Sequence, residues 1–265
     1  MNTIATTASA TTPRAWRLRD TLGVWLRESA FQFLGVLRMP AFALPTLLFP
    51  AMFYLFFGVV FGKGGVEQAA YVLATLGTFG IMAPALFGFG VGVAMEREHG
   101  ILALKRVFPL PSAAYFFGKV AMSALFALLI VIILAILAVT LGGVRLAAGE
   151  WALLTIVLVL GTLPFCALGL VVGLMANGQA SAAIVNLIYL PMSFLSGLWI
   201  PIRVMPHLLQ QFAPALPAYH VGQLALMAIG HDTRTSVITH IGYLLVFSLI
   251  CLFFATRLWR RIQDR

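Results

Sequence analysis

Long apolar runs alternate with short polar segments along most of the chain. A helix of roughly 20 residues crosses about 30 Å of hydrocarbon, and six of the runs are long enough to do so. We expect six transmembrane helices near residues 41–61, 70–94, 115–141, 151–175, 181–200 and 236–257. Prolines inside the first and fifth runs predict kinks at Pro45, Pro50 and Pro191. The pattern therefore predicts an all-α polytopic membrane protein.

The N-terminal region has a different pattern. Residues 1–13 are rich in Thr and Ala without periodicity, so we expect a disordered tail. Residues 14–39 mix tryptophans and arginines with apolar residues, which is typical of an amphipathic helix at a membrane interface. A solvated, slightly apolar tail is the alternative. We expect a single transmembrane domain over residues 14–260 and a cytoplasmic tail at 261–265.

Residues 96–111 form a charged segment between the second and third runs. Five of its first eleven residues are charged, in a chain that is 9% charged. Apolar residues interleave with Lys105 and Arg106, which favours a short amphipathic helix on the membrane surface, and Pro109 and Pro111 would end it. A soluble partner could bind here, or the segment could be a solvated loop that only anchors the topology.

Composition fixes the class of protein. At 62% apolar residues and a mean hydropathy of +1.01, the chain is no soluble globular domain. The net charge of +9 could indicate nucleic acid. However, the charges lie between apolar runs without a basic face of stacking aromatics, so the expected partner is membrane lipid and not nucleic acid.

Basic residues are distributed unevenly among the polar segments. With both termini cytoplasmic, 13 of the 17 Lys and Arg residues lie inside and four, Lys63, Arg145, Arg203 and Arg234, lie outside. This bias follows the positive-inside rule. We therefore expect cytoplasmic termini and a cytoplasmic charged segment, in the cell membrane, as in a bacterial inner membrane.

Residues 201–235 form a long outer connection that is too apolar for a free aqueous loop. Four prolines interrupt it, Pro201, Pro206, Pro214 and Pro217. Non-helical backbone at membrane depth must be shielded by protein. We expect short re-entrant helices that dip into the outer leaflet between the fifth and sixth spans.

Chemistry for an independent pump or enzyme is sparse. The six runs contain almost no ionisable group, and Lys119 and His240 lie near the ends of their runs. Ion-coupled carriers usually keep ionisable groups at mid-membrane. The stretch 58–64 has the wrong glycine spacing for a phosphate loop. The five histidines lack zinc-ligand spacing on one helix, and no serine has a nucleophile-elbow context. We expect no catalytic, cofactor or metal site on this chain.

Glycines inside the runs have a packing interpretation. Gly88, Gly90 and Gly92 superficially resemble a dinucleotide loop but follow no strand, and Gly169 and Gly173 are four residues apart. Small residues at such spacing allow transmembrane helices to approach closely. We expect both sets at helix contacts.

Two motifs resemble the membrane-spanning permease subunit of ATP-binding-cassette (ABC) type-2 exporters. The first runs from Glu96–Arg97–Glu98–His99–Gly100–Ile101–Leu102 through Pro109–Leu110–Pro111–Ser112 to Tyr115–Phe116–Phe117–Gly118–Lys119. The second contains Leu195–Ser196–Gly197–Leu198–Trp199–Ile200–Pro201, Met205–Pro206 and Leu216–Pro217–Ala218–Tyr219–His220. Isoleucine stands at 101 where the family more often has threonine, and Pro111 is an additional proline.

The resemblance implies a division of labour between chains. The charged segment would be a coupling helix on a separate cytoplasmic ABC ATPase, which would bind ATP and Mg. Two ATPases and a second permease copy, in a homodimer, would complete the exporter. The implied coupling residues are Glu96, Arg97, Glu98, Gly100, Ile101, Leu104 and Phe108. The implied outer gate contains Gly197, Pro201, Pro206 and Pro217.

The sequence is also compatible with two other functions. One is a polytopic membrane enzyme that acts on lipid-linked substrates, which would need polar groups converging at one depth. The other is a non-transporting membrane scaffold. Aromatic residues in the spans would suit an amphipathic or lipid-like cargo, while polysaccharide and ion export are alternatives.

Overall fold

The computed structural model describes residues 18–62, 64–101, 112–231 and 235–263. The expected disordered tail, the first residues of the interfacial helix, residues 102–111 of the charged segment and the last two residues lie outside this part. Every regular element in the described part is helical.

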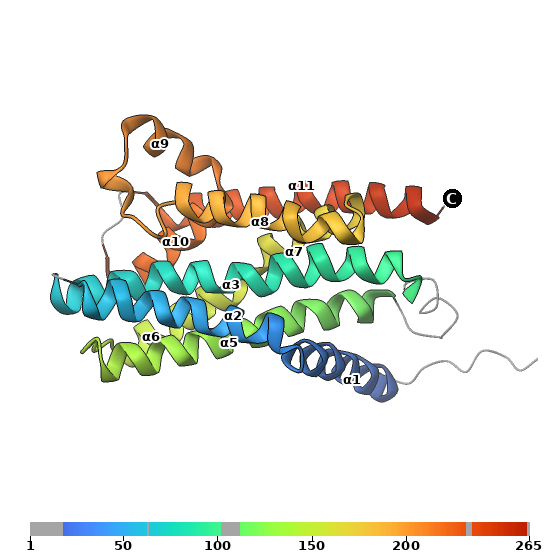
Figure 1. Ribbon diagram of the computed structural model, residues 1–265, viewed down its shortest axis with the longest axis horizontal. Coiled ribbons are helices and arrows are strands. Elements are labelled where there is room, and N and C mark those ends of the chain that lie inside the picture. Colours follow the sequence, from blue (N-terminus) through green and yellow to red (C-terminus); the bar gives the residue numbers. More distant parts are fainter. Residues whose placement is uncertain (1–17, 63, 102–111, 232–234, 264–265) are drawn as a thin grey trace, which may run out of the picture.

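The long helices run side by side along one axis (Figure 1). They are α1 (Leu18–Leu37), α2 (Pro40–Tyr54) with the π-helix η1 (Leu55–Val60), α3 (Gly65–Glu98), α5 (Ser112–Thr140), α6 (Ala148–Leu160), α7 (Thr162–Met175), α8 (Gly178–Leu195) and α11 (Val237–Gln263). Shorter elements η2 (Ile202–Val204), α9 (His207–Phe212), η3 (Ala213–Ala215) and α10 (Pro217–Ala228) lie between α8 and α11.

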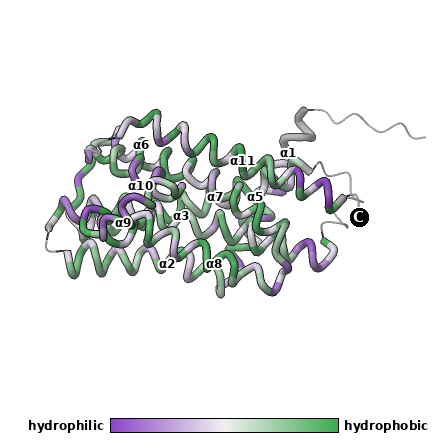
Figure 2. The backbone as a smooth tube through the Cα atoms, turned by 90° about the horizontal axis from the view of Figure 1, so that it is seen from above, coloured by the Kyte–Doolittle hydropathy of each residue, from purple (hydrophilic) through white to green (hydrophobic). Residues whose placement is uncertain are grey.

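In the described residues, six helical stretches are long and apolar enough to cross a membrane. They are Pro40–Val60, Gly65–Glu98, Ala113–Thr140, Ala148–Met175, Gly178–Leu195 and Val237–Ile262. The prediction of six spans is thereby confirmed. Apolar residues dominate the middle of the bundle, and hydrophilic segments gather towards its ends (Figure 2).

The fourth and fifth spans differ from the prediction in where the helix is interrupted. The fourth span is divided at Gly161, where a Cβ would lie 2.7 Å from the Val157 carbonyl oxygen and 2.7 Å from Val221. The fifth was expected to reach residue 200 but ends at Leu195, because Gly197 has a φ of +78° that leaves the helical region. Apolar periodicity continues through both breaks, so it does not reveal them.

The second span, α3, is the centre of the bundle. In its most apolar 18-residue stretch 94% of residues are buried, against 11% for α11. It contacts α2, α5, α7, α8 and α10. A helix that is apolar around its whole circumference is expected to be buried in this way.

As predicted, glycines lie where helices make their closest contacts. A Cβ at Gly173 of α7 would lie 2.5 Å from the Phe89 carbonyl oxygen of α3, and one at Gly169 would lie 3.0 Å from Phe89 Cβ. A Cβ at Gly90 would lie 2.6 Å from Val185 of α8. Backbones in contact at these distances leave no room for any side chain, so the α3–α7 contact is set by glycine.

Helix α1 lies along the first half of α5. The Trp25 and Phe117 rings are 4.9 Å apart between centroids, and Phe33 meets the buried Phe126 at 5.4 Å. The expected interfacial segment thus contains a helix over Leu18–Leu37. The start of α1, the end of α3 and the end of α11 lie at the same end of the bundle (Figure 1).

Candidate functional sites at the two ends of the bundle

The end of α3 carries the acidic and basic residues that begin the charged segment. The Glu96 carboxylate lies 2.9 Å from Lys119 Nζ of α5 and accepts a hydrogen bond from the Tyr115 hydroxyl at 2.7 Å. Lys119 is almost fully buried and also donates to the Gly88 carbonyl oxygen at 3.3 Å. Tyr115 and Lys119 are one turn apart, so both reach Glu96 from the same face of α5.

The next two residues bind the junction between α7 and α8. The Arg97 guanidinium donates to the carbonyl oxygens of Leu174 and Ala176, at the C-terminal end of α7. Glu98 accepts a hydrogen bond from the Gly178 backbone N–H, at the start of α8. A cation at a helix C-terminus and an anion at a helix N-terminus are the favourable placements for the helix dipoles.

We call Glu96, Arg97 and Glu98 the α3 latch, because three successive side chains attach the end of α3 to α5, α7 and α8. The sequence predicted these residues as contacts for a partner. In the structure their charged groups have partners within the chain. The contacts join residues up to 80 positions apart, so no local pattern could have indicated them.

The remaining coupling residues follow the latch. Helix α3 ends at Glu98, and Gly100 adopts a φ of +70°, the left-handed conformation that glycine commonly supplies after a helix. The Ile101 side chain is 40% exposed, so it is open to contact. Leu104 and Phe108 lie outside the described residues.

The predicted gate residues each occupy a boundary between short elements. Gly197 follows α8, Pro201 and Pro206 precede η2 and α9, and Pro217 begins α10. Proline at the start of a helix removes no helical hydrogen bond, which explains these positions. The four residues therefore divide this segment into its short elements.

The predicted outer segment, residues 201–235, has an exposed part and a part that is inserted into the helix bundle. None of the residues of η2 or α9 is buried, and the Val204, Leu208 and Phe212 side chains are largely exposed. In α10, eight of the 12 residues are buried, and the helix packs on α3, α6 and α11. Among the described elements of this segment, α10 is thus the one inserted into the helix bundle.

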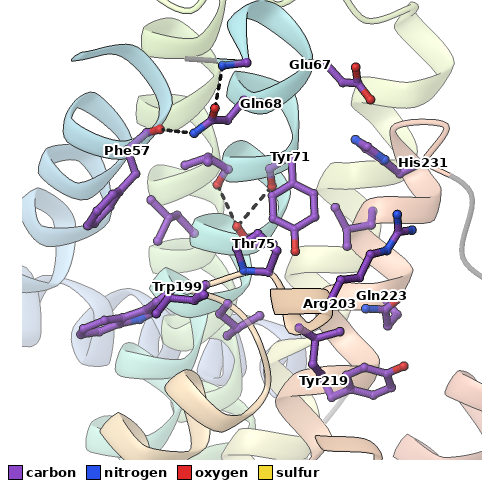
Figure 3. Close-up of a pocket in the computed structure, with 18 of the residues that line it drawn as sticks. Phe57, Glu67, Gln68, Tyr71, Thr75, Trp199, Arg203, Tyr219, Gln223 and His231 are labelled. Atoms are coloured by element: carbon purple, nitrogen blue, oxygen red, sulfur yellow. Dashed lines mark hydrogen bonds between the residues drawn. The ribbon is translucent and has the colours of Figure 1, made fainter. Parts of the chain in front are cut away.

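A cavity of about 890 Å³ lies between the N-terminal half of α3 and this segment (Figure 3). We call it the outer cavity, after the orientation that the sequence predicts. Its polar and aromatic lining includes Phe57, Glu67, Gln68, Tyr71, Thr75, Trp199, Arg203, Gln210, Tyr219, Gln223 and His231. The sequence did not reveal this site because its residues come from six separate stretches of the chain.

A buried histidine pair joins α10 to α11. His220 Nδ1 and His240 Nδ1 are 2.8 Å apart, and His220 Nε2 is 2.8 Å from the Pro214 carbonyl oxygen. The carbonyl can only accept, so His220 Nε2 carries a proton, and neutral His220 must accept at Nδ1 from His240. The Tyr243 ring stacks on His220 at 3.9 Å. In its neutral form, the histidine pair therefore attaches α10 to α11.

A second cavity, of about 1030 Å³, opens beside α7 and α11. Its lining is almost entirely apolar, with Thr256, Trp259 and Arg260 near the end of α11. Such a surface suits the hydrocarbon of the bilayer.

Removal of one member of the Glu96–Lys119 pair should destabilise the folded protein. Lys119→Met leaves a largely buried carboxylate without its cation, and we expect a loss of about 3 kcal/mol in the free energy of unfolding. The double variant Lys119→Met/Glu96→Gln should lose at least about 1 kcal/mol less than the sum of the single variants. Denaturant titration in mixed micelles measures these differences. Arg38→Met, at an exposed position, is the control, and strict additivity would contradict the coupling.

Acid should weaken the attachment of α10. Burial lowers the pKa of His220 from 6.5, although the hydrogen bond to the Pro214 carbonyl acts in the opposite direction. Above pH 6.5, His220 is neutral in both the folded and the unfolded state. As the pH falls, the unfolded state takes up a proton first, so the folded state loses stability. Between pH 7.5 and 5.5 we expect a drop of roughly 2–4 °C in the melting temperature, which corresponds to about 1 kcal/mol.

Two variants isolate this effect. His220→Phe should reduce the pH dependence by about half, since His240 remains, and His207→Gln, on the exposed helix α9, should keep it. Equal pH dependence in the wild type and His220→Phe would contradict the assignment.

The chain is similar to known transport proteins over most of its length. The family model described as ABC-2 type transporter matches residues 29–230, more than half of the chain. A protein of Bacillus subtilis (strain 168) that carries the name transport permease YvfS is 29% identical over 234 residues, which cover 86% of this chain and 96% of that protein. The match includes five of the six spans in full, the α3 latch and α10. The chain therefore belongs to the ABC-2 type transporter family.

Proposed function

We propose that the chain is the permease subunit of an ABC exporter and forms the translocation pathway with a second copy of itself. Two cytoplasmic ABC ATPase subunits would bind ATP and Mg and drive the pair between inward- and outward-facing states. The family and the six apolar helices support a membrane permease. The α3 latch is the observation that carries the coupling role.

The α3 latch gives the charged segment a mechanical connection to the bundle. A force applied after Gly100 would act first on the end of α3. Charge-assisted hydrogen bonds are roughly twice as strong as neutral ones, and the latch joins α3 to three other helices through such bonds. A displacement at the cytoplasmic end would then move α3, α5, α7 and α8 together.

This arrangement divides the predicted coupling residues into two groups. Glu96, Arg97 and Glu98 would transmit the movement inside the permease. The exposed Ile101 would contact the ATPase, together with Leu104 and Phe108 as sequence-based expectations. Gly100 would set the direction of the segment through its left-handed backbone.

The exposed face of α8 supports a second copy of this chain as a partner. Asn186, the ninth of its 18 residues, is exposed between Ala183 and Leu190 on that face. An uncovered amide in hydrocarbon lacks hydrogen-bond partners, and small neighbours allow a second helix to approach closely. In a two-fold dimer each Asn186 can meet its counterpart, which supplies both a donor and an acceptor.

Coupling can be tested with the purified permease and its ATPase in nanodiscs. We expect Glu98→Lys to abolish most vanadate-sensitive ATP hydrolysis that depends on the permease, because lysine cannot accept from the Gly178 N–H and places a cation at a helix N-terminus. Arg145→Glu, a charge reversal at an exposed position between α5 and α6, should leave hydrolysis near wild type. Normal hydrolysis and transport in Glu98→Lys would contradict the coupling role. A complex that is insensitive to ATP and vanadate would favour the enzyme or the scaffold.

The dimer can be tested by cross-linking in native membranes. In a background with Cys166 and Cys251 replaced by alanine, Ala183→Cys should form a disulfide between copies, and Leu249→Cys, exposed on α11, should not. Adding Asn186→Leu to Ala183→Cys should reduce the cross-linked fraction severalfold. Equal yields from positions 183 and 249 would contradict the α8 interface.

A further inference from the structure

The outer cavity has two opposite walls of different character. In the view of Figure 3, Glu67, His231 and Arg203 follow one another along one side, and Phe57 and Trp199 lie on the other. Glu67 and Arg203 are both exposed to the cavity and its opening. A pocket with an apolar wall and a few convergent polar groups has the character of a ligand site.

The two charges do not neutralise each other. Within the described residues, the Glu67 carboxylate and the Arg203 guanidinium form no ion pair and no hydrogen bond with each other or with another side chain. A close pair would have closed the cavity by joining α3 to η2. The cavity instead presents an acceptor and a cation separately, beside the amides of Gln210 and Gln223.

The apolar wall is held in a fixed position. The Trp199 ring packs against Phe53 and Phe79 at centroid distances of 5.4 Å. Its Nε1–H is buried and has no hydrogen-bond partner in the described part of the chain. A buried indole N–H without a partner is costly, and the ring contacts with Phe53 and Phe79 offset that cost.

Charge restricts the class of ligand. An anion alone would be repelled by Glu67, and a cation alone would be repelled by Arg203. A group that carries both charges can place its ammonium at Glu67 and the Tyr71 ring, and its phosphate at Arg203 and Gln223. An attached chain would then lie against Phe57 and Trp199.

We propose that the outer cavity binds a zwitterionic ammonium–phosphate head group, with the ammonium at Glu67 and the phosphate at Arg203. The volume of about 890 Å³ accommodates the head group and the first part of an apolar chain. Binding here does not depend on the ATPase-coupling role, since none of the residues involved belongs to the α3 latch.

The test is native mass spectrometry of the purified full-length protein after reconstitution with equal amounts of phosphatidylethanolamine and phosphatidylglycerol. The wild type should retain phosphatidylethanolamine preferentially. Arg203→Gln should reduce that retention at least about fivefold, and Glu67→Gln should shift the preference towards phosphatidylglycerol. Arg145→Gln removes an exposed outer arginine that does not line the cavity, and it should behave as the wild type.

Soluble glycerophosphoethanolamine distinguishes the two sources of this head group. If it displaces the retained lipid, the cavity accepts the free head group from water, and if only the lipid binds, the apolar wall is required. Arg203→Lys, which keeps the charge, should retain most of the binding and shows that loss in Arg203→Gln is not a folding defect. Equal retention of both lipids by the wild type, or equal losses in Arg203→Gln and Arg145→Gln, would overturn the proposal.

Discussion

The close contact between α3 and α7 is the constraint on which the rest of the bundle depends. Gly169 and Gly173 bring the α7 backbone against α3 carbonyl groups, so the two helices cannot slide apart or rotate without losing contact along their length. With α7 fixed there, α11 packs on α7, and α5 and α8 pack on other sides of α3. Apolar burial supplies no preference between helices in lipid, so backbone proximity determines which helices meet.

Because α3 is held so firmly, it connects the two ends of the protein. Its 34 residues correspond to roughly 50 Å of helix, from the outer cavity at Glu67 to the α3 latch at Glu96. Pro84 lies midway and cannot donate a helical hydrogen bond, while its own carbonyl oxygen accepts from the buried Ser123 hydroxyl at 3.3 Å. The bond from Ser123 thus ties α5 to α3 at the point where the hydrogen-bonding of α3 is weakest.

Much of this arrangement could be predicted from the sequence, and the limits have physical causes. Apolar run length indicates spans, and glycine spacing indicates contacts, because both are local properties. The partners of Arg97 and Glu98 come from a turn nearly 80 residues later, and the histidine pair joins α10 to α11. These contacts depend on how helices are placed, which no spacing along the chain records. The cytoplasmic orientation and the coupling helix remain sequence-based predictions.

Polar groups in this protein fall into two sets with different consequences. Lys119, Glu96 and His220 have partners inside the chain, and these bonds fix helices to one another. Asn186 on α8 and Arg203 at the outer cavity form no such bond within the described residues. Because an unpartnered polar group in or near hydrocarbon costs free energy, such groups persist where something outside the chain can satisfy them. A second copy at α8 and a zwitterionic head group at the outer cavity would each supply what the isolated chain lacks.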